Sequence, residues 1–328
     1  MASAPSINFG GVNVQITKTK DDRLPKLKKK SIWSKIWSQK VLFLMLLPGL
    51  LYYVVFRYGP MYGLITAFQD YSPFLGIADS PFVGTEHFER LFQNEEFWTM
   101  FFNTLRTGVL QLLVVFPAPI IFALILNEVR QAHMKKVYQT VSYLPHFLSV
   151  VIVCSIFINL FSFDGLVSKI VVFFGGEAKN FLMESEYYDL VYHMSTIWAS
   201  FGSGSIVYLA ALSGVDQQLY EAAAIDGCSR LKMIWKITLP SIMPTIVIMF
   251  LLQVGNVIRI GPDKTLLLYQ PSTYEVADII GSYVYRVGIE NRDYSYAAAV
   301  GLFESVLAAV ILFTTNRAAK KTTGTSLW

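Results

Sequence analysis

A small set of polar side chains stands inside long apolar runs of this 328-residue sequence. Gln253 and Asn256 are three positions apart in the run LLQVGNVI, so they share one face of a helix. Thr196, Ser200 and Ser203 lie in STIWASFGSGS, a run rich in small residues. Amide and hydroxyl groups inside a membrane helix are costly unless they face protein or water. These residues therefore either line a polar path or bond and pack against a neighbouring helix.

The elements that would position these side chains are membrane helices. The sequence is 54% hydrophobic and only 15% charged, whereas about a quarter of the residues of a soluble domain are charged. Several uncharged runs reach the roughly 20 residues that a helix needs to cross a bilayer. We predict an all-α membrane protein with six spans, at about residues 41–57, 105–127, 137–162, 190–213, 241–259 and 295–315.

The basic residues predict the orientation. With the amino terminus inside, 18 of the 27 Lys and Arg residues fall in the inner segments, as the positive-inside rule favours. Both termini are then cytoplasmic. We predict a disordered basic tail over 1–30, a transmembrane permease domain over 31–316 and a second cytoplasmic tail over 317–328. Within the permease domain we predict three outer segments, at 58–100, 164–189 and 260–293. The lysine cluster at 25–30 is interpreted as an anchor beside the first span and not as a nucleic-acid site.

A polar module over residues 216–240 interrupts the apolar pattern on the predicted cytoplasmic side. Asp216 can cap a short helix beginning near Gln217, and Gly227 can end it in a left-handed conformation. Ser229 can cap a second helix that passes into the fifth span near Pro240. The first helix would present Ala222 and Ala223, with Glu221 beside them, as a small flat face suited to a groove on another protein. An ordinary loop between spans is the alternative.

The spacing within this module carries a resemblance. The segment from Glu221 to Pro240 resembles the EAA motif of permease subunits of binding-protein-dependent ABC importers. In it Glu221-Ala222-Ala223 is followed after three residues by Gly227, after nine more by Ile237, and after one more by Leu239-Pro240. The stretches GPMYGLITAFQDYSPFLGI, YLPHFLSVVIV, LLQVGN and the terminal SLW are similar to the oligosaccharide branch, which resembles the maltose type. The likeness covers nearly all of the chain from about residue 31. Arg259 and Gly261-Pro262-Asp263 depart from the neutral turn of many relatives.

The resemblance implies a type I ABC importer permease in a prokaryotic cytoplasmic membrane. Its partners would be a second permease, two ATPase subunits and an extracytoplasmic sugar-binding protein. The sequence has no Gly-x-x-x-x-Gly-Lys-Ser/Thr loop, so we expect no cofactor in this chain, no enzymatic activity, and ATP and Mg²⁺ bound by the partner ATPases. The residues expected to contact the ATPase are Glu221, Ala222, Ala223, Asp226, Gly227, Leu239 and Pro240.

The resemblance also implies an oligosaccharide site near the middle of the membrane. Hydroxyl and amide groups would match sugar hydroxyls, and an aromatic face would stack on a sugar ring. The expected contacts are Thr196, Ser200, Ser203, Gln253, Asn256 and Trp198. Arg259 either extends its charge to the interface as an anchor or binds the carboxylate of a uronic acid residue.

Three other functions would make different demands on the sequence. A membrane enzyme would need clustered His or acidic residues, but His146, His193 and Glu304 are at separations that form no recognisable motif. A channel or scaffold is disfavoured by the spacing of the EAA-like motif. An ABC permease for a non-sugar solute, such as a peptide or an anion, remains an alternative, because no single residue demands a sugar.

Overall fold

The structure is a computed structural model that describes residues 7–9, 12–14 and 39–328. It divides into two units, residues 1–62 and 63–328. In the first unit, strands β1 (Ile7–Phe9) and β2 (Val12–Val14) form an antiparallel pair in which Asn8 is opposite Asn13. These six residues fall within the tail that the sequence predicts to be disordered. The rest of the predicted tail over 1–30, including its lysine cluster, lies outside the described residues.

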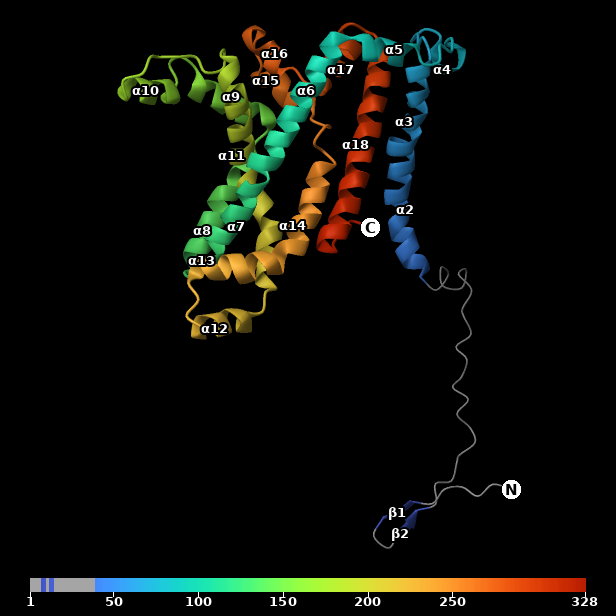
Figure 1. The fold of residues 1–328 in the computed structure, drawn as a ribbon. Coiled ribbons are helices and arrows are strands. Elements are labelled where there is room, and N and C mark those ends of the chain that lie inside the picture. The colour runs from blue at the N-terminus through green and yellow to red at the C-terminus, as the bar shows by residue number, and fades with distance from the viewer. Residues whose placement is uncertain (1–6, 10–11, 15–38) are drawn as a thin grey trace, which may run out of the picture. The chain divides into compact units, whose positions relative to one another are not determined.

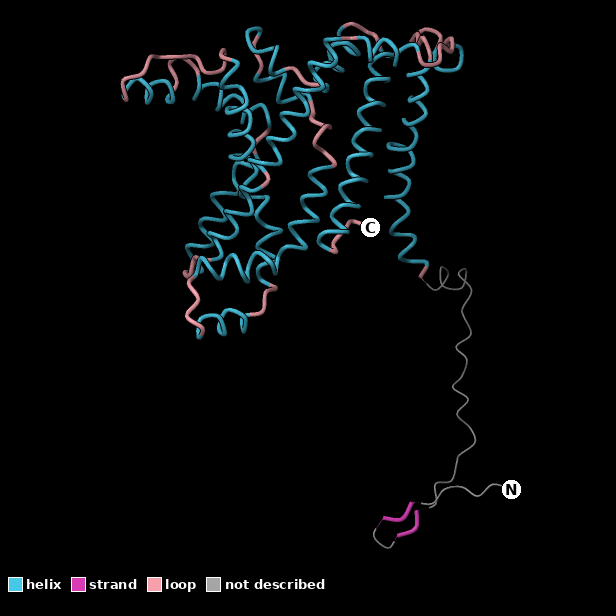
Figure 2. Tube along the Cα trace, in the orientation of Figure 1, coloured by secondary structure: helices cyan, strands magenta, loops and turns pink. Residues whose placement is uncertain are grey.

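The rest of the described chain is almost entirely helical (Figure 1 and Figure 2). The α-helices are α2 (Lys40–Tyr53), α3 (Gly59–Met61), α4 (Gly76–Asp79), α5 (Glu86–Gln93), α6 (Glu95–Leu110), α7 (Pro117–Asn127), α8 (Ala132–Tyr143), α9 (Val150–Phe161), α10 (Leu166–Phe173), α11 (Ser185–Ser213), α12 (Gln217–Ile225), α13 (Arg230–Met233), α14 (Leu239–Val254), α15 (Pro262–Leu268), α16 (Tyr274–Ala277), α17 (Ile280–Tyr285) and α18 (Tyr294–Thr323). Shorter 3₁₀ or π-helical turns join several of them: η1 (Val54–Tyr58), η2 (Tyr62–Phe68), η3 (Gln111–Val115), η4 (Leu144–Phe147), η5 (Ile234–Thr238), η6 (Pro271–Thr273) and η7 (Arg286–Glu290).

The described residues contain six helical stretches that are long and apolar enough to cross a membrane, the number that the sequence predicted. Helices suit lipid because all of their backbone hydrogen bonds are internal. Large apolar side chains such as Leu113 and Phe102 are exposed on them, as expected for surfaces that face lipid. The stretches are Lys40–Phe68, Glu95–Asn127, Val150–Phe173, Ser185–Ser213, Arg230–Val254 and Tyr294–Thr323.

The region that we predicted as a single third span, 137–162, is divided. Helix α8 runs into the 3₁₀ turn η4, which contains Pro145, and α9 begins only after Leu148 adopts an extended conformation. Proline has no N–H to continue a helical ladder. The Ser149 side chain then caps α9 by accepting a hydrogen bond from the Ile152 N–H at 3.4 Å. The candidate span consequently starts at Val150.

In the second unit, short helices gather at the two ends of the long ones (Figure 1). Helices α12 and α13 lie at one end, and α5, α10, α15, α16 and α17 lie at the other. The chain turns near η5: α13 lies across the end of the bundle, whereas α14 runs along it. The two ends can therefore serve different partners.

Two glycines allow backbones to touch inside this unit. A Cβ atom added at Gly202 of α11 would lie 2.0 Å from the Ser142 carbonyl oxygen of α8, and one at Gly108 of α6 would lie 2.1 Å from the Val257 carbonyl oxygen. No side chain fits at those distances. Close approach through small residues is the common way for membrane helices to pack.

We predict that Gly202→Ala destabilises the protein by about 1–3 kcal/mol, because the added methyl group must push α11 away from α8. The measurement is the thermal unfolding midpoint of the purified protein in detergent. The matched control is Gly301→Ala on α18, where an added Cβ meets nothing within 4 Å and the midpoint should stay the same or rise. Equal midpoints for the two variants would contradict the inferred close packing.

Candidate functional site

The short helix α12 ends and begins as its sequence predicted. The Asp216 side chain accepts a hydrogen bond from the Gln218 N–H at 2.9 Å, which satisfies one free donor of the first turn. At the other end Gly227 has φ +71°, and the Cys228 N–H donates to the Ala223 carbonyl oxygen at 2.9 Å. This is the Schellman arrangement that glycine favours. The predicted cap and the predicted left-handed glycine are both confirmed.

Helix α12 is fastened to the bundle on one side only. The Tyr220 hydroxyl hydrogen-bonds to the Thr238 hydroxyl at 2.9 Å, and Thr238 is buried at the start of the fifth span. Arg230 forms an ion pair with Glu128 at 3.5 Å, which links α13 to the end of α7. These contacts hold the module against the second and fifth spans.

The remaining surface of the module is open. Glu221 and Ala222 are exposed and Ala223 is half-buried, so Ala222 contributes more surface than its neighbour to the predicted alanine face. Ile225, one turn further on, is 88% exposed. In the turn η5, which follows α13, Trp235 is 71% exposed. Exposed apolar side chains of this size next to charged ones are typical of an interaction surface.

The structure places the other predicted module residues around these. Asp226 is exposed at the carboxyl end of α12, and Leu239 and Pro240 open α14. Pro240 directly follows the π-helical turn η5, at whose end the Leu239 N–H donates to the Ile234 carbonyl oxygen. Ser229 stands at the N-terminal boundary of α13, but its side chain makes no capping hydrogen bond there.

A second feature is a polar cavity of about 280 Å³ at the far end of α14. It collects three of the seven residues that we predicted along a substrate path: Thr196, Asn256 and Arg259. Arg259 is exposed, and its Nη2 donates to the Ser305 hydroxyl at 3.0 Å. The whole lining consists of Gln111, Val150, Tyr192, Thr196, Asn256, Arg259, Ile260, Gly261, Asp263 and Lys264.

The other four predicted path residues lie outside this lining. Ser200 and Ser203 donate to carbonyl oxygens of their own helix, of Thr196 and Ser200 respectively, at 2.7 and 3.2 Å. Trp198 packs on the Phe157 ring, 5.9 Å between centroids. Gln253 is half-buried on α14. The cavity does not bring these four side chains together with Thr196.

Sequence reasoning missed several polar lining residues, among them Gln111, Tyr192 and, on α15, Lys264. Lys264 makes the closest contacts of these. Its Nζ donates to the Tyr192 carbonyl oxygen at 2.6 Å and to the Thr196 hydroxyl, and it lies 4.2 Å from the centre of the Tyr192 ring. Burial away from water lowers the pKa of its ammonium to about 7, against a smaller opposing effect of Cys154. The one available signal was the charged pair Asp263-Lys264, placed directly after a membrane span.

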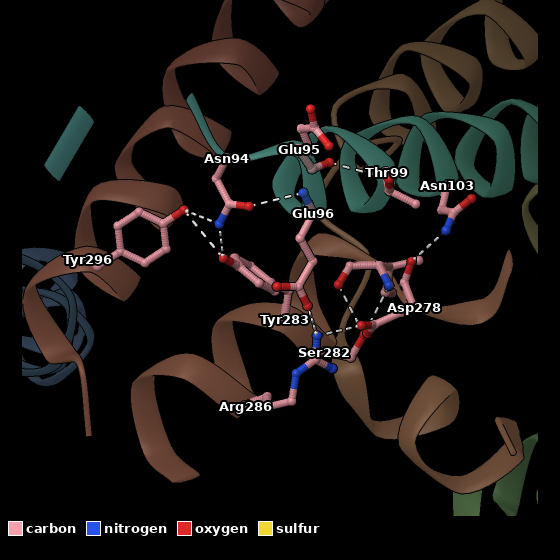
Figure 3. Close-up of polar contacts among 11 residues, drawn as sticks. Asn94, Glu95, Glu96, Thr99, Asn103, Asp278, Ser282, Tyr283, Arg286 and Tyr296 are labelled. Carbon is pink, nitrogen blue, oxygen red and sulfur yellow. Dashed lines mark hydrogen bonds and ion pairs between the residues drawn. The ribbon is translucent and has the colours of Figure 1, made fainter. Parts of the chain in front are cut away.

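A polar network fixes the segment that carries α15 to α17 onto the start of the second span (Figure 3). Arg286 forms ion pairs with the Asp278 carboxylate at 2.7 Å and with Glu96 at 3.0 Å. The Asn103 amide donates to the Glu275 and Asp278 carbonyl oxygens at 2.8 and 3.0 Å. This network holds in place the segment that brings Lys264 to the cavity.

These features define a class of protein: a multi-pass membrane permease subunit with an exposed helical module at one end and a polar cavity toward the other. The chain belongs to the family of binding-protein-dependent transport system inner membrane components, whose pattern matches residues 115–320. The predicted family and the predicted six-helix permease fold are confirmed.

Individual relatives are similar over most of their length. The polygalacturonan/rhamnogalacturonan transport system permease protein YteP of Bacillus subtilis is 45% identical over 297 residues, 90% of this chain and 92% of that protein. The arabinooligosaccharides transport system permease protein AraP of Bacillus subtilis is 26% identical, over 88% of this chain and 91% of that one. One chain in the crystal structure of a bacterial alginate ABC transporter, in complex with an alginate pentasaccharide-bound periplasmic protein, matches with a TM-score of 0.82. That chain is 39% identical, over 90% of this chain and 99% of that one.

We predict that Arg286→Met destabilises the protein by about 3–5 kcal/mol, because the Asp278 side chain, only 3% exposed, is left as an unpaired buried charge. The measurement is the denaturation midpoint in detergent. Adding Asp278→Asn to the same variant should recover much of the loss, since the buried charge is then removed.

The control is Lys179→Met, which removes one partner of a more exposed pair with Glu184 at 3.7 Å and should cost at most about 1 kcal/mol. The interpretation is wrong if the double variant is no more stable than Arg286→Met alone.

Proposed function

We propose that this chain is a membrane-spanning subunit of an ABC importer that carries acidic oligosaccharides into the cytoplasm. With a second permease it would form the translocation path for an oligosaccharide delivered by an extracytoplasmic binding protein. Separate ATPase subunits would bind ATP and Mg²⁺ and drive the transport. The membrane would be the cytoplasmic membrane of a prokaryote, with both termini and α12 on the inside, as the distribution of basic residues predicts.

The observation that carries the energy-coupling part of the proposal is the exposed helix α12. It is capped at both ends, fastened at Tyr220, and leaves Glu221, Ala222 and Ile225 open to a partner. A short, rigid helix of this kind can insert in a groove and transmit a displacement, because its attachment to Thr238 leads straight into the fifth span.

Two kinds of observation support the acidic cargo. Two of the similar proteins, at 45% and 39% identity, are named for or crystallised with saccharides that contain uronic acids: polygalacturonan/rhamnogalacturonan, and an alginate pentasaccharide on the periplasmic protein. The cavity also offers the matching chemistry. Gln111, Asn256 and Thr196 supply groups that can bind sugar hydroxyls, and Arg259 and Lys264 supply positive charge. Of the two roles considered for Arg259, this arrangement favours contact with a carboxylate.

The mechanism is alternating access by rigid bodies. ATP-driven closure of the two ATPases would move α12 and its partner on the second permease, and the attached spans would rotate so that the cavity opens outward to the binding protein. Hydrolysis would return the path to the inward-open state. Nucleotide can act in this way only by binding one of the two conformations more tightly.

We predict that Glu221→Lys lowers both uptake and ligand-stimulated ATP hydrolysis by roughly tenfold or more, because it reverses the charge at the centre of the docking face. The measurement is ATPase activity and transport by the reconstituted complex. The control is Glu177→Lys, the same reversal at an exposed residue between α10 and α11, which should behave as wild type. If the Glu221→Lys variant assembles with the ATPases and takes up substrate as well as wild type does, α12 does not have the proposed docking role.

The cargo is tested on the same reconstituted importer with its binding protein. We expect trigalacturonate or a short alginate oligomer to stimulate ATP hydrolysis severalfold, and peptides and inorganic anions to have no effect. Stimulation by neutral oligosaccharides alone would show that the cargo is a neutral oligosaccharide and not an acidic one. Stimulation by a peptide or an inorganic anion, with none by any oligosaccharide, would favour the alternative of a permease for a non-sugar solute.

A further inference from the structure

We propose that Lys264, with Arg259 on the same cavity, forms a subsite that binds the carboxylate of one uronic acid residue during transport, an inference that rests on the proposed import of acidic oligosaccharides. The subsite lies just beyond the end of α14, between α11 and α15.

The first support is the state of the Lys264 ammonium. It has three donors, of which the Tyr192 carbonyl oxygen and the Thr196 hydroxyl take two. Among residues 39–328, no carboxylate lies within 4 Å of its Nζ. Its surroundings thus offer a neutral oxygen pair and an aromatic face, but no counter-charge. A half-buried cation without a counter-ion gains most from an anion that arrives with a ligand.

The second support is the charge of the lining. The lining contains two cationic side chains, Arg259 and Lys264, and one carboxylate, that of the exposed Asp263. Arg259 also lines a neighbouring cavity that contains Glu304, and it is hydrogen-bonded to Ser305, so part of its charge is directed there. Lys264, by contrast, lines the polar cavity and not this neighbouring one.

The third support is the pattern of neutral groups around the charge. Gln111 reaches the cavity from the π-helical turn η3, Thr196 from α11 and Asn256 from the end of the fifth span. A volume of about 280 Å³ is near the lower end of ligand cavities, which hold roughly 300–1,000 Å³. The cavity therefore fits one sugar ring of a longer chain, with its hydroxyl groups on the amides and its carboxylate on Lys264.

A purely structural role for Lys264 makes a different prediction. If Lys264 only joined α15 to α11 by hydrogen bonds, it would need only a donor, and a neutral side chain of similar length could replace it without changing ligand binding. If it binds a carboxylate, its positive charge is required. An uncharged side chain at this position should then lose the preference for acidic ligands while the protein stays folded and assembled.

The test uses the purified complex of both permeases and the ATPases, without the binding protein. The probes are trigalacturonate and its fully methyl-esterified form, which has the same rings and no charge. Ligand-induced thermal stabilisation gives an apparent affinity for each. In wild type the acid should bind more tightly than the ester. Lys264→Met should weaken binding of the acid roughly 10- to 100-fold and leave the ester unchanged, whereas Lys264→Arg should keep most of the preference.

Lys169→Met, an exposed lysine on α10, is the matched control and should resemble wild type. If Lys264→Met prevents assembly, Lys264→Gln replaces it, since glutamine keeps a donor for Tyr192 and Thr196. A neutral variant that keeps the wild-type preference for the acid overturns the inference and leaves the proposed function standing. A reconstituted wild-type importer that takes up no oligosaccharide, charged or neutral, overturns both.

Discussion

The free-energy cost of taking charged and polar groups out of water governs where this chain places them. Inside a bilayer or a packed protein interior, an unsatisfied backbone or side-chain group has no solvent to return to, so it must find a partner in the protein. Asp278 is buried and has Arg286 beside it, and the Asn103 amide spans two carbonyl oxygens. Lys264 lies over an aromatic ring with two neutral acceptors, and no carboxylate of residues 39–328 lies within 4 Å of it. Asp278 thus has its counter-charge within the described chain, and in the proposed importer Lys264 would receive one from the bound uronic acid.

The same constraint separates the two ends of the bundle. The module around α12 carries Asp216, Glu221 and Asp226, which could not stay in lipid, and its caps satisfy the backbone groups that a short helix leaves open. It can therefore leave the membrane without losing its shape. In the proposed mechanism that rigidity is needed, because a helix that frayed on contact would absorb the displacement of the ATPase instead of passing it on.

Part of this arrangement was predictable from the sequence because it depends on local rules. Apolar run length gave six spans, and the capping residues Asp216 and Gly227 marked the ends of α12. The direction of side chains inside the bundle is not local. Ser200 and Trp198 lie on the same span as Thr196, yet only Thr196 lines the cavity, since the packing of α9 against α11 covers Trp198. Lys264 reaches the cavity only because α15 folds beside α11, a tertiary contact that no periodicity encodes.

One span joins the two functional features. Helix α14 starts at Leu239, next to the Thr238 hydroxyl that holds α12, and ends at Val254, two residues before Asn256 of the cavity. Helix α14 is unbroken over this length, although Pro244 lies inside it. A helix can pass on a displacement because its backbone hydrogen bonds have no substitute in lipid. Helix α11, which carries Thr196, also leads to α12, because it ends at Ser213 and α12 begins at Gln217. A movement of α12 would therefore reach Asn256 through α14 and Thr196 through α11, whereas Lys264 is on α15. In the proposed importer, a path of this kind needs no separate relay between energy input and ligand release, because these two helices connect α12 to the cavity directly.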